Sequence, residues 1–597
     1  MRFCFVSTHR GSHFMTELLS AMAAATESAG HAAELVFDEF PPLREECIYV
    51  VIPHEFHAWG KPGGFPDRPQ RERTIALCTE NPGTEWFDAT YELVPELAAA
   101  VSINRSSAAE LQRRGVRCEH IQLGYVPQWD TWSGDATAQR PLDVLYLGAA
   151  DPRRDPLLAG LGKELSVREC ELLIPPLEPR TAPRPDFLTG SEKYHRLRSA
   201  KVLLNLHRTT SASLEWMRFI EAICNGCVVV SEPCLDNEPL IPGEHFVQAS
   251  ADRIALAVNT VLDDPDRLRQ IRACAYEFIR GELPMQHAGE RLGKLASELP
   301  REPPAAHGSR FADAHGTHAP PQLPQPRTRQ PPPSVRAKRG WLRSLPARTA
   351  NRLSRPTIVA TTPCYPAAAP RISVLAVCRP DEKIESLESV AEAFDGSLEL
   401  LVLDWQTDDR STTTHERFVR DRPWLPAMLL RQSASRGRGH SLNMLTERSR
   451  GDYVFVLGAG CGIYPSALKR LVATLDADPS AFFCYPMVAA FDGDRPTQLL
   501  GSLPWEPERL KRGNWIDDTA LLRRERLLAL GGYCTDPRLA GWEGFELWCR
   551  CAESGGRGAH VPQVLAWRRA GVVPGTSEMW TLMRARFPRL LGDRKDD

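Results

Sequence analysis

The chain has 597 residues and a formal net charge of −2, with 42% hydrophobic and 25% charged residues. This length exceeds what one hydrophobic core supports, and the proportions are those of ordinary soluble globular proteins. The nearly balanced charge gives no overall electrostatic reason to expect binding to nucleic acid.

Strands and helices alternate over the first 300 residues. Short apolar runs predict strands at residues 2–7, 47–52, 74–78, 101–102, 143–147 and 201–206. Amphipathic periodicity predicts helices at residues 14–29, 108–114 and 251–263. This order predicts two doubly wound α/β lobes, 1–135 and 136–300, with a cleft between them.

Residues 213–232, SLEWMRFIEAICNGCVVVSE, combine a helix, a glycine stop and a buried strand. Arg218 and Glu221 lie one helical turn apart on that helix. A glutamate at the carboxyl edge of a parallel sheet can accept hydrogen bonds from a ribose, and an arginine can bind a phosphate. An ordinary surface ion pair would explain the two residues equally well.

Residues 301–370 are rich in proline and arginine and lack periodicity, which predicts a disordered linker. Within this linker, residues 335–355 carry seven basic residues and no acid. That segment could make a weak contact with an anionic membrane surface. A solvated basic linker is the favoured interpretation, because Pro346 interrupts any helix there.

A third alternating series follows the linker. It predicts strands at residues 372–377, 398–403 and 453–457, and helices at residues 384–394 and 465–475. Residues 371–597 therefore read as one further α/β lobe.

Cysteine usage and the start of the chain indicate an intracellular setting. Many of the 16 cysteines lie in apolar runs, and Cys224 and Cys227 match the CxxC spacing without a second pair at zinc-ribbon distance. The first residues, MRFCFVSTHRGSHF, do not form a signal peptide, and no run reaches the ~18 apolar residues of a membrane span. These features predict a cytoplasmic protein with reduced thiols.

Several motifs of the front half occur in a familiar order. They are RFIEA followed by Gly226 and two valines, LNLHR at 204–208, PGEHFV at 242–247 and CTENPG at 78–83. The front half thereby resembles GT-B fold glycosyltransferases of the spore-maturation-protein type (group 1). The resemblance implies an acceptor-binding first lobe and a second lobe that holds a nucleotide sugar.

The resemblance also assigns roles to the donor-binding residues. Glu221 would hold the ribose hydroxyls and Arg218 would lie near the diphosphate. The commoner retaining pattern has a second glutamate about two turns before Glu221. Ser213 stands there in this chain, and the nearest acid is Glu215.

Further donor-binding candidates follow two strands of the second lobe. Gly148 would let backbone N–H groups approach a phosphate, and Arg153 or Arg154 would neutralise its charge. His207 could donate to a phosphate or accept a proton, although a lone histidine at a strand end is more often structural.

Acceptor activation needs a base, and three residues of the first lobe are candidates. His54 and Glu55 follow one predicted strand, and Glu80 follows the next. Each could equally be a loop residue. GT-B enzymes need no metal when cationic side chains stabilise the leaving diphosphate, so no metal is expected in the front half.

The rear half matches another set of motifs, again in order. They lie at residues 372–377, 398–412 (LELLVLDWQTDDRST), 436–457 (RGRGHSLNMLTERSRGDYVFVL) and 531–555 (GGYCTDPRLAGWEGFELWCRCAESG). From residue 371 the chain thereby resembles family 2 glycosyltransferases with the GT-A fold. Asp404 matches the aspartate that contacts the nucleotide base and ribose, and Asp409 is also kept.

The family's metal motif and base are both missing. Two aspartates of a DxD motif bind Mg²⁺ or Mn²⁺ in family 2 enzymes, and residues 458–460 of this chain are Gly-Ala-Gly. The family's base is the second acid of WED, and this chain has Gly544 in that position. A divalent cation is therefore expected only if the rear lobe is active.

Two interpretations of the rear lobe remain open. The favoured one is a degenerate domain that binds a sugar, a nucleotide or a partner without catalysis. In the other, Glu543 or Glu546 acts as the base and Asp517 and Asp518 supply charge.

The sequence thus predicts a cytoplasmic glycosyltransferase with an active front module and an accessory rear lobe. Its expected partners are a nucleotide sugar and a carbohydrate, lipid-linked or protein acceptor, with no nucleic acid. A bifunctional enzyme and a non-catalytic carbohydrate- or nucleotide-binding scaffold are the alternatives. Donor sugar, nucleobase and stereochemistry are not encoded in these patterns.

Overall fold

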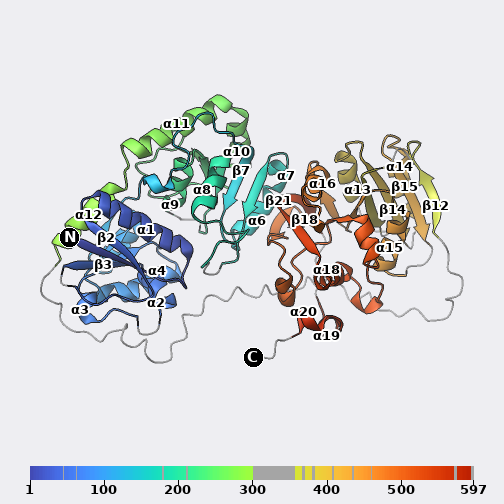
Figure 1. Ribbon diagram of the computed structural model, residues 1–597. Coiled ribbons are helices and arrows are strands. Elements are labelled where there is room, and N and C mark those ends of the chain that lie inside the picture. The colour runs from blue at the N-terminus through green and yellow to red at the C-terminus, as the bar shows by residue number, and fades with distance from the viewer. Residues whose placement is uncertain are drawn as a thin grey trace. The chain divides into compact units, whose positions relative to one another are not determined.

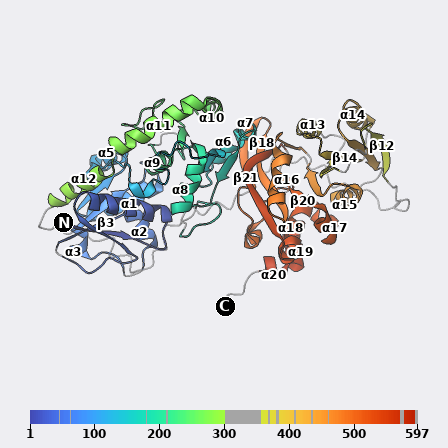
Figure 2. The ribbon, with the colours of Figure 1, turned by 45° about the horizontal axis from the view of Figure 1, so that its top comes forward.

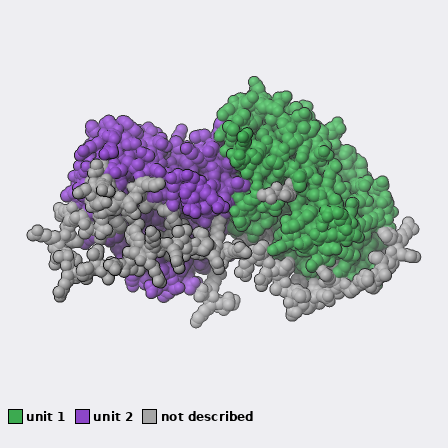
Figure 3. Space-filling model, turned by 180° about the vertical axis from the view of Figure 1, so that it is seen from behind, with its two compact units in different colours: residues 1–154, 171–328 green, residues 155–170, 329–597 purple. Residues whose placement is uncertain are grey.

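The computed structural model describes most of the chain outside the predicted linker. It covers residues 1–299 and 356–592 except 45, 62–63, 178–180, 210–212, 366–369, 379–383, 406–408, 433–435, 459 and 570–574. The chain divides into two compact units, shown in Figure 3. Unit 1 comprises residues 1–154 and 171–328, and unit 2 comprises residues 155–170 and 329–597. The predicted basic segment 335–355 lies outside the described residues.

The first lobe of unit 1 is a six-stranded parallel sheet in the order β2-β1-β3-β4-β5-β6 (Figure 1). Its strands are β1 (Arg2–Ser7), β2 (Ala32–Phe37), β3 (Cys47–Val51), β4 (Thr74–Cys78), β5 (Ala99–Ser102) and β6 (Cys118–His120). The α-helices are α1 (His13–Ser28), α2 (Pro53–Trp59), α3 (Arg68–Arg71), α4 (Glu85–Leu93) and α5 (Arg105–Arg113). Strands β1, β3 and β4 are almost entirely buried, as expected for parallel strands covered on both faces.

The second lobe is a five-stranded sheet in the order β11-β10-β9-β7-β8. Its strands are β7 (Leu142–Leu147), β8 (Cys170–Leu173), β9 (Ala200–Asn205), β10 (Val228–Ser231) and β11 (Val247–Gln248). The helices that follow β7 along the chain are α6 (Arg154–Gly160), α7 (Gly162–Leu165), α8 (Gly190–Ser199), α9 (Trp216–Cys224), α10 (Ile254–Asp263), α11 (Pro265–Gly281) and α12 (Gln286–Ser297).

The last helix of unit 1 returns to the first lobe. Helix α12 packs against α1, and Gly289 allows the close approach, because a Cβ there would stand 2.4 Å from the carbonyl oxygen of Ala25. One hydrophobic core runs from Phe3 and Phe5 through Trp216 and Phe219 to Leu292. The two lobes of unit 1 are therefore joined by a shared core.

Unit 2 holds a mixed sheet in the order β12-β15-β14-β13-β16-β20-β18-β21-β17, with β19 beside β18. Its strands are β12 (Thr357–Thr361), β13 (Ile372–Cys378), β14 (Leu398–Trp405), β15 (Ala427–Gln432), β16 (Tyr453–Leu457), β17 (Cys461–Ile463), β18 (Ala481–Asp492), β19 (Arg495–Leu500), β20 (Leu521–Arg523) and β21 (Arg557–Arg568). The helices of residues 371–597 are α13 (Glu385–Glu392), α14 (Asp409–Arg420), α15 (Arg438–Arg448), α16 (Ala467–Ala477), α17 (Arg524–Ala529), α18 (Glu543–Glu553), α19 (Ser577–Arg586) and α20 (Pro588–Leu591). Strands β18 and β21 lie side by side (Figure 2).

The predicted fold class is confirmed: two parallel-sheet lobes come first, and one larger α/β sheet follows. One expectation was wrong, because β12 lies inside the predicted linker and pairs antiparallel with β15. The strand has five residues, TIVAT, and Ile358 is 63% exposed, so no alternation of buried and exposed positions marks this edge strand. No helix among the described residues is long and apolar enough to cross a bilayer.

Candidate functional site

The three candidate bases of the first lobe lie together. Helix α2 begins directly after β3, which places His54 and Glu55 at the carboxyl end of that strand, and Glu80 follows β4. His54 is buried, with Nδ1 2.9 Å from Oγ1 of Thr90 and Nε2 3.8 Å from Oε1 of Glu80. Burial lowers the pKa of His54 to about 4, so this histidine is neutral near pH 7 and does not form an ion pair with Glu80.

Glu55 titrates close to neutral pH. Burial raises its pKa to about 7, the amide of Ser12 opposes this by donating to the carboxylate, and the charge of Glu80 raises it further. Gly11 makes room for this carboxylate, because a Cβ on Gly11 would stand 2.3 Å from Oε1 of Glu55. A base with a pKa close to the working pH combines availability with proton affinity.

Glu80 connects the first lobe with the second. Burial raises its pKa, and the guanidinium of Arg208, which follows β9, opposes that shift. Arg208 also lies 3.6 Å from Oδ2 of Asp151, and its side chain is 42% exposed. The carboxyl edges of both sheets therefore contribute charged groups to the same region of unit 1.

Glu221 does not face bulk solvent. Its Oε1 accepts a hydrogen bond from Nζ of Lys193 at 2.7 Å, and the same ammonium donates to Oε2 of Glu17 at 2.6 Å. Glu17 lies on α1 of the first lobe, so Lys193 links the two lobes through two carboxylates. Burial raises the pKa of Glu221 to about 7, and Lys193 opposes that shift. Burial would lower the pKa of Lys193, but Glu221 and Glu17 raise it.

Arg218 lies one turn away and points to the end of β9. Its Nη1 donates to Oδ1 of Asn205 at 2.6 Å and lies 3.8 Å from Oε1 of Glu215. The side chain is 22% exposed, which leaves it partly accessible.

Glu215, at the N-cap of α9, gathers the polar groups of this edge. It accepts hydrogen bonds from Nδ2 of Asn205 at 2.8 Å and from the ring of His207, and it lies 3.7 Å from Nη2 of Arg154. Burial would raise its pKa, but the hydrogen bond of His207 and the charge of Arg218 lower it to about 2. The sequence had placed no acid two turns before Glu221, and Glu215 supplies an ionised carboxylate close to that position.

His207 has the structural role that the sequence left open. Nδ1 lies 3.1 Å from Glu215, Nε2 lies 3.2 Å from the carbonyl oxygen of Glu232, and the main-chain amide donates to Oε2 of Glu232. Both ring nitrogens are thus occupied by protein groups, and His207 holds the β9 and β10 ends together.

Two of the phosphate-binding expectations need correction. The amide of Gly148 donates to the carbonyl oxygen of Leu173 at 3.2 Å, so it does not point to a ligand. A glycine is needed here because a Cβ would stand 2.5 Å from Oη of Tyr146. Arg153 forms a two-pronged ion pair with the carboxylate of Glu232 and donates to the carbonyl oxygen of His207, which fixes its side chain.

The CxxC pair of unit 1 has no redox or metal geometry. All 16 cysteines are free, and Cys224 and Cys227 are buried. Burial raises the pKa of Cys227 to about 12, so it stays a thiol.

In unit 2, Asp404 is the last residue but one of β14 and is fully buried. Its Oδ1 lies 3.3 Å from Nδ1 of His415, and its Oδ2 has no hydrogen-bond partner among the described residues. Asp409 is the first residue of α14, and its side chain is outside the described part of the chain.

The residues of unit 2 do not fit the family's metal. Gly458 and Gly460 stand where the resemblance places the two aspartates of the DxD motif, and the neighbouring Cys461 is buried with its pKa raised to about 12 by that burial. Within the described ranges, no group of three His, Cys, Asp or Glu side chains could hold a metal ion.

The two glutamates proposed as displaced bases differ. Glu543 is buried with its pKa raised by burial, and it lies 3.7 Å from Nη1 of Arg438. Glu546 is fully buried and holds both Arg550, at 2.8 Å and 3.0 Å, and Arg586, at 3.0 Å. Two guanidinium groups occupy this carboxylate, so Glu546 has a structural role.

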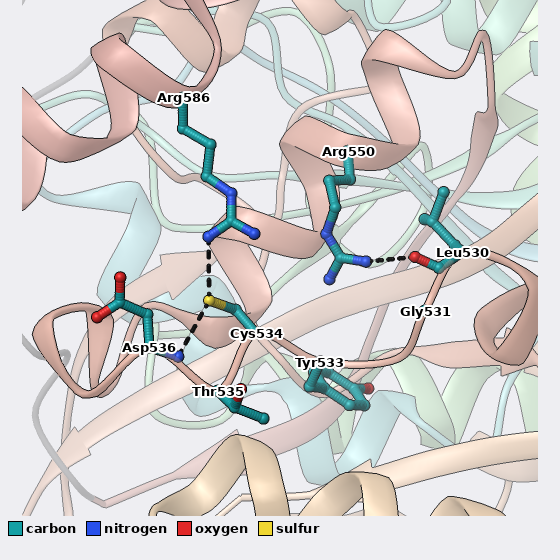
Figure 4. Close-up of a pocket in the computed structure, with 8 residues that line it drawn as sticks. All are labelled: Leu530, Gly531, Tyr533, Cys534, Thr535, Asp536, Arg550 and Arg586. Carbon is teal, nitrogen blue, oxygen red and sulfur yellow. Dashed lines mark hydrogen bonds between the residues drawn. The ribbon is translucent and has the colours of Figure 1, made fainter.

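The same arginines border a pocket of about 490 Å³ in unit 2 (Figure 4). Nη1 of Arg586 donates to Sγ of Cys534, and Nη1 of Arg550 donates to the carbonyl oxygen of Leu530. Arg550 and Arg586 also both bind the carboxylate of Glu546, so the cationic groups of this pocket are already paired within the protein.

Two family models match the chain. Residues 160–293 match the model described as "Glycosyl transferase-like", and residues 380–525 match "Glycosyl transferase family 2". The chain therefore carries two segments that match glycosyltransferase family models, one in each half. The narrower likeness to the spore-maturation-protein type stays a prediction. No curated protein matches the chain.

Similar solved structures include residues 1–349 of TarS from S. aureus, with 16% identity, 36% of this chain and 64% of that chain covered, and a TM-score of 0.31. Another is the mannosyltransferase PcManGT from Pyrobaculum calidifontis in complex with GDP-Man and Mn²⁺, with 21% identity, coverages of 39% and 65%, and a TM-score of 0.26. This chain spans less than two thirds of either protein's length. At these values the likeness identifies neither donor nor acceptor.

Proposed function

We propose that unit 1 transfers a sugar from a nucleotide-sugar donor to an acceptor without a metal ion. The observation that supports this most is the meeting of charged groups from both lobes at their carboxyl edges. Glu80 and its neighbour Glu55 come from the first lobe, and Arg208, whose charge acts on Glu80, comes from the second. Ligands of open α/β sheets bind at that edge.

In this proposal the donor lies over α9. Arg218 and Arg208 face the diphosphate and stabilise the charge that develops on it as the glycosidic bond breaks. Glu221 holds the ribose hydroxyls, through its second oxygen or in place of Lys193. The bond between Lys193 and Glu17 keeps the lobes together while the donor is bound.

Glu55 is proposed as the base that takes the proton of the acceptor hydroxyl. Its pKa of about 7 makes roughly half of it a carboxylate at neutral pH. Burial keeps that pKa high, and like-charge repulsion from Glu80 adds to the effect. The neutral ring of His54 lies beside these carboxylates and adds no charge to them.

The rear domain is proposed as an accessory domain that binds without transferring. The acceptor is proposed to be a carbohydrate, a lipid-linked sugar or a protein, and the donor's nucleobase is open. No cofactor is proposed for unit 1.

The test measures release of nucleoside diphosphate from a panel of nucleotide sugars, with and without candidate acceptors. We expect turnover in EDTA that Glu55→Gln reduces by about 10²-fold or more. Glu39→Gln is the matched control, because Glu39 is an exposed glutamate of the same lobe that pairs with Lys61. Binding of a donor with no turnover for any acceptor would instead favour the scaffold alternative.

A further inference from the structure

Two arginine–aspartate pairs lie where the family 2 metal site would be. Nη1 of Arg438 donates to Oδ2 of Asp518 at 2.7 Å, and Nη1 of Arg568 donates to Oδ2 of Asp517. Strand β17 pairs antiparallel with β21, and its register sets Cys461 opposite Arg568. Arg568 therefore lies beside the segment that carries the metal ligands in family 2 enzymes.

Both pairs belong to one cluster. Cys461 interacts electrostatically with Asp517, Arg568, Arg438 and Asp518. Asp517 is 4% exposed and Arg568 15%, whereas Arg438 and Asp518 are 23% and 27% exposed. The cluster is thus closed on the Asp517 side and open on the Asp518 side.

The two arginine–aspartate pairs together carry the same summed charge as a loaded metal site, and the buried Glu543 adds a further carboxyl group beside Arg438. Two carboxylates and two guanidinium groups sum to zero, as do two carboxylates and one divalent cation. Asp518 and Glu543 raise the pKa of Arg438, and Asp517 raises that of Arg568, in each case against burial, so both arginines stay charged. Here two arginine side chains carry the positive charge that a metal ion supplies in family 2 enzymes.

The guanidinium group also suits the ligand. Its planar fork matches phosphate oxygens, and its five N–H donors can hold a carboxylate and a phosphate at the same time. Elsewhere in unit 2, the buried Oδ2 of Asp404 also has no hydrogen-bond partner among the described residues.

We propose that the rear domain binds the diphosphate of a nucleotide without a divalent metal ion, with Arg438 and Arg568 in place of the cation. The inference concerns unit 2 alone. It gives the accessory domain a ligand class and stands whether or not unit 1 transfers a sugar.

Isothermal titration of the full chain in EDTA tests this, with UDP, GDP, ADP, CDP and dTDP as probes. The chain carries Arg218→Gln, so that the proposed site of unit 1 is weakened and unit 2 is read alone. We expect one of the five nucleotides to bind, and its affinity to change less than about twofold when Mg²⁺ or Mn²⁺ replaces EDTA. Replacing Arg568 and Asp517 together, by Gln and Asn, avoids an unpaired buried charge and should weaken binding about tenfold or more.

The control replaces Arg371 and Asp476 by Gln and Asn, because this more exposed arginine–aspartate pair, with an N–O separation of 2.9 Å, belongs to the same unit and lies outside the cluster. It should leave the affinity unchanged. Binding that requires a divalent ion, binding indifferent to the Arg568 pair, or no binding of any probe would each overturn the inference. Failure of the function proposed for unit 1 would give a different result. In that case the chain that keeps Arg218 would show no second nucleotide-binding site beyond the one seen with Arg218→Gln.

Discussion

The carboxylate of Asp518 fills the space that a side chain on Gly544 would need. A Cβ built on Gly544 would stand 1.8 Å from Oδ1 of Asp518. Gly544 is the position that the resemblance assigns to the family's catalytic acid. Residue 544 therefore supplies no carboxylate. The carboxylate of Asp518 occupies the space that an acid at residue 544 would take, and it accepts a hydrogen bond from Arg438.

This relationship predicts a coupled pair. Gly544→Asp alone forces two carboxylates into one space and should lower the free energy of unfolding by about 1–3 kcal/mol or more. The exchange Gly544→Asp with Asp518→Gly should recover most of that loss. Thermal unfolding of the two variants measures both effects. Gly281→Asp is the control, because a Cβ on Gly281 meets nothing within 4 Å. Equal melting temperatures for Gly544→Asp and the wild type would contradict the overlap.

Glu55 makes stability depend on pH. Its pKa rises from 4.5 to about 7 on folding, so the folded chain binds the proton more tightly than the unfolded chain. Stability should then fall as pH rises from about 4.5 to about 7 and stay level above that, by at most about 3 kcal/mol from this group. Glu55→Gln should remove this part of the slope in denaturant titrations at several pH values. An unchanged slope would mean that Glu55 titrates normally.

The same pKa predicts the pH dependence of transfer. Because the base must be ionised, kcat/KM should rise with pH, with a midpoint near 7, and then level off. Glu80→Gln removes a repelling charge, so it should shift this midpoint to lower pH while Glu39→Gln leaves it in place. A midpoint that Glu80→Gln does not move would separate Glu55 from the proton transfer.

Lys193 should matter more to stability than either carboxylate it holds. Lys193→Met leaves Glu17 and Glu221 close together and without their cation, which costs about 3–5 kcal/mol for a broken buried pair. Glu221→Gln keeps a hydrogen-bond partner for the ammonium and should cost less. Denaturant unfolding measures both, and Lys201→Met, which breaks an ion pair with Asp143 of the same lobe, is the control. A smaller loss for Lys193→Met than for the control would contradict the linking role.

The sequence predicted the parallel strands and α9 because burial imposes a regular spacing of apolar residues, which is visible in the sequence. It also placed His54, Glu55 and Glu80 correctly at strand ends, since parallel strands align their carboxyl ends. It missed Glu17 and Lys193, whose bond joins residues 176 positions apart and has no local pattern. A weak signal existed, because Lys193 lies four residues before Leu197 on the buried face of α8 and Glu17 is the first acid in an apolar helix.

The phosphate-binding expectations failed for a similar reason. Gly148 and Arg153 have the right residue types at the right strand end, and their partners come from elsewhere in the fold. Leu173 takes the Gly148 amide, and Glu232 takes the Arg153 guanidinium. A short motif cannot reveal such partners, because they are fixed by the order of strands in the sheet.

Separate substitutions distinguish one active site from two. If unit 2 only binds its ligand, Glu221→Ala should abolish the whole transfer, and Glu543→Ala should leave product formation within about threefold of wild type. If both units transfer sugars, Glu543→Ala or Asp518→Asn should remove one of two products and keep the other. Product analysis by mass, rather than by nucleotide release, reads this directly. Glu525→Ala serves as control, because Glu525 lies in the first turn of α17 and outside the charged cluster. The raised pKa of the buried Glu543 makes it a competent proton acceptor, so a lost product would place a second transfer reaction in unit 2.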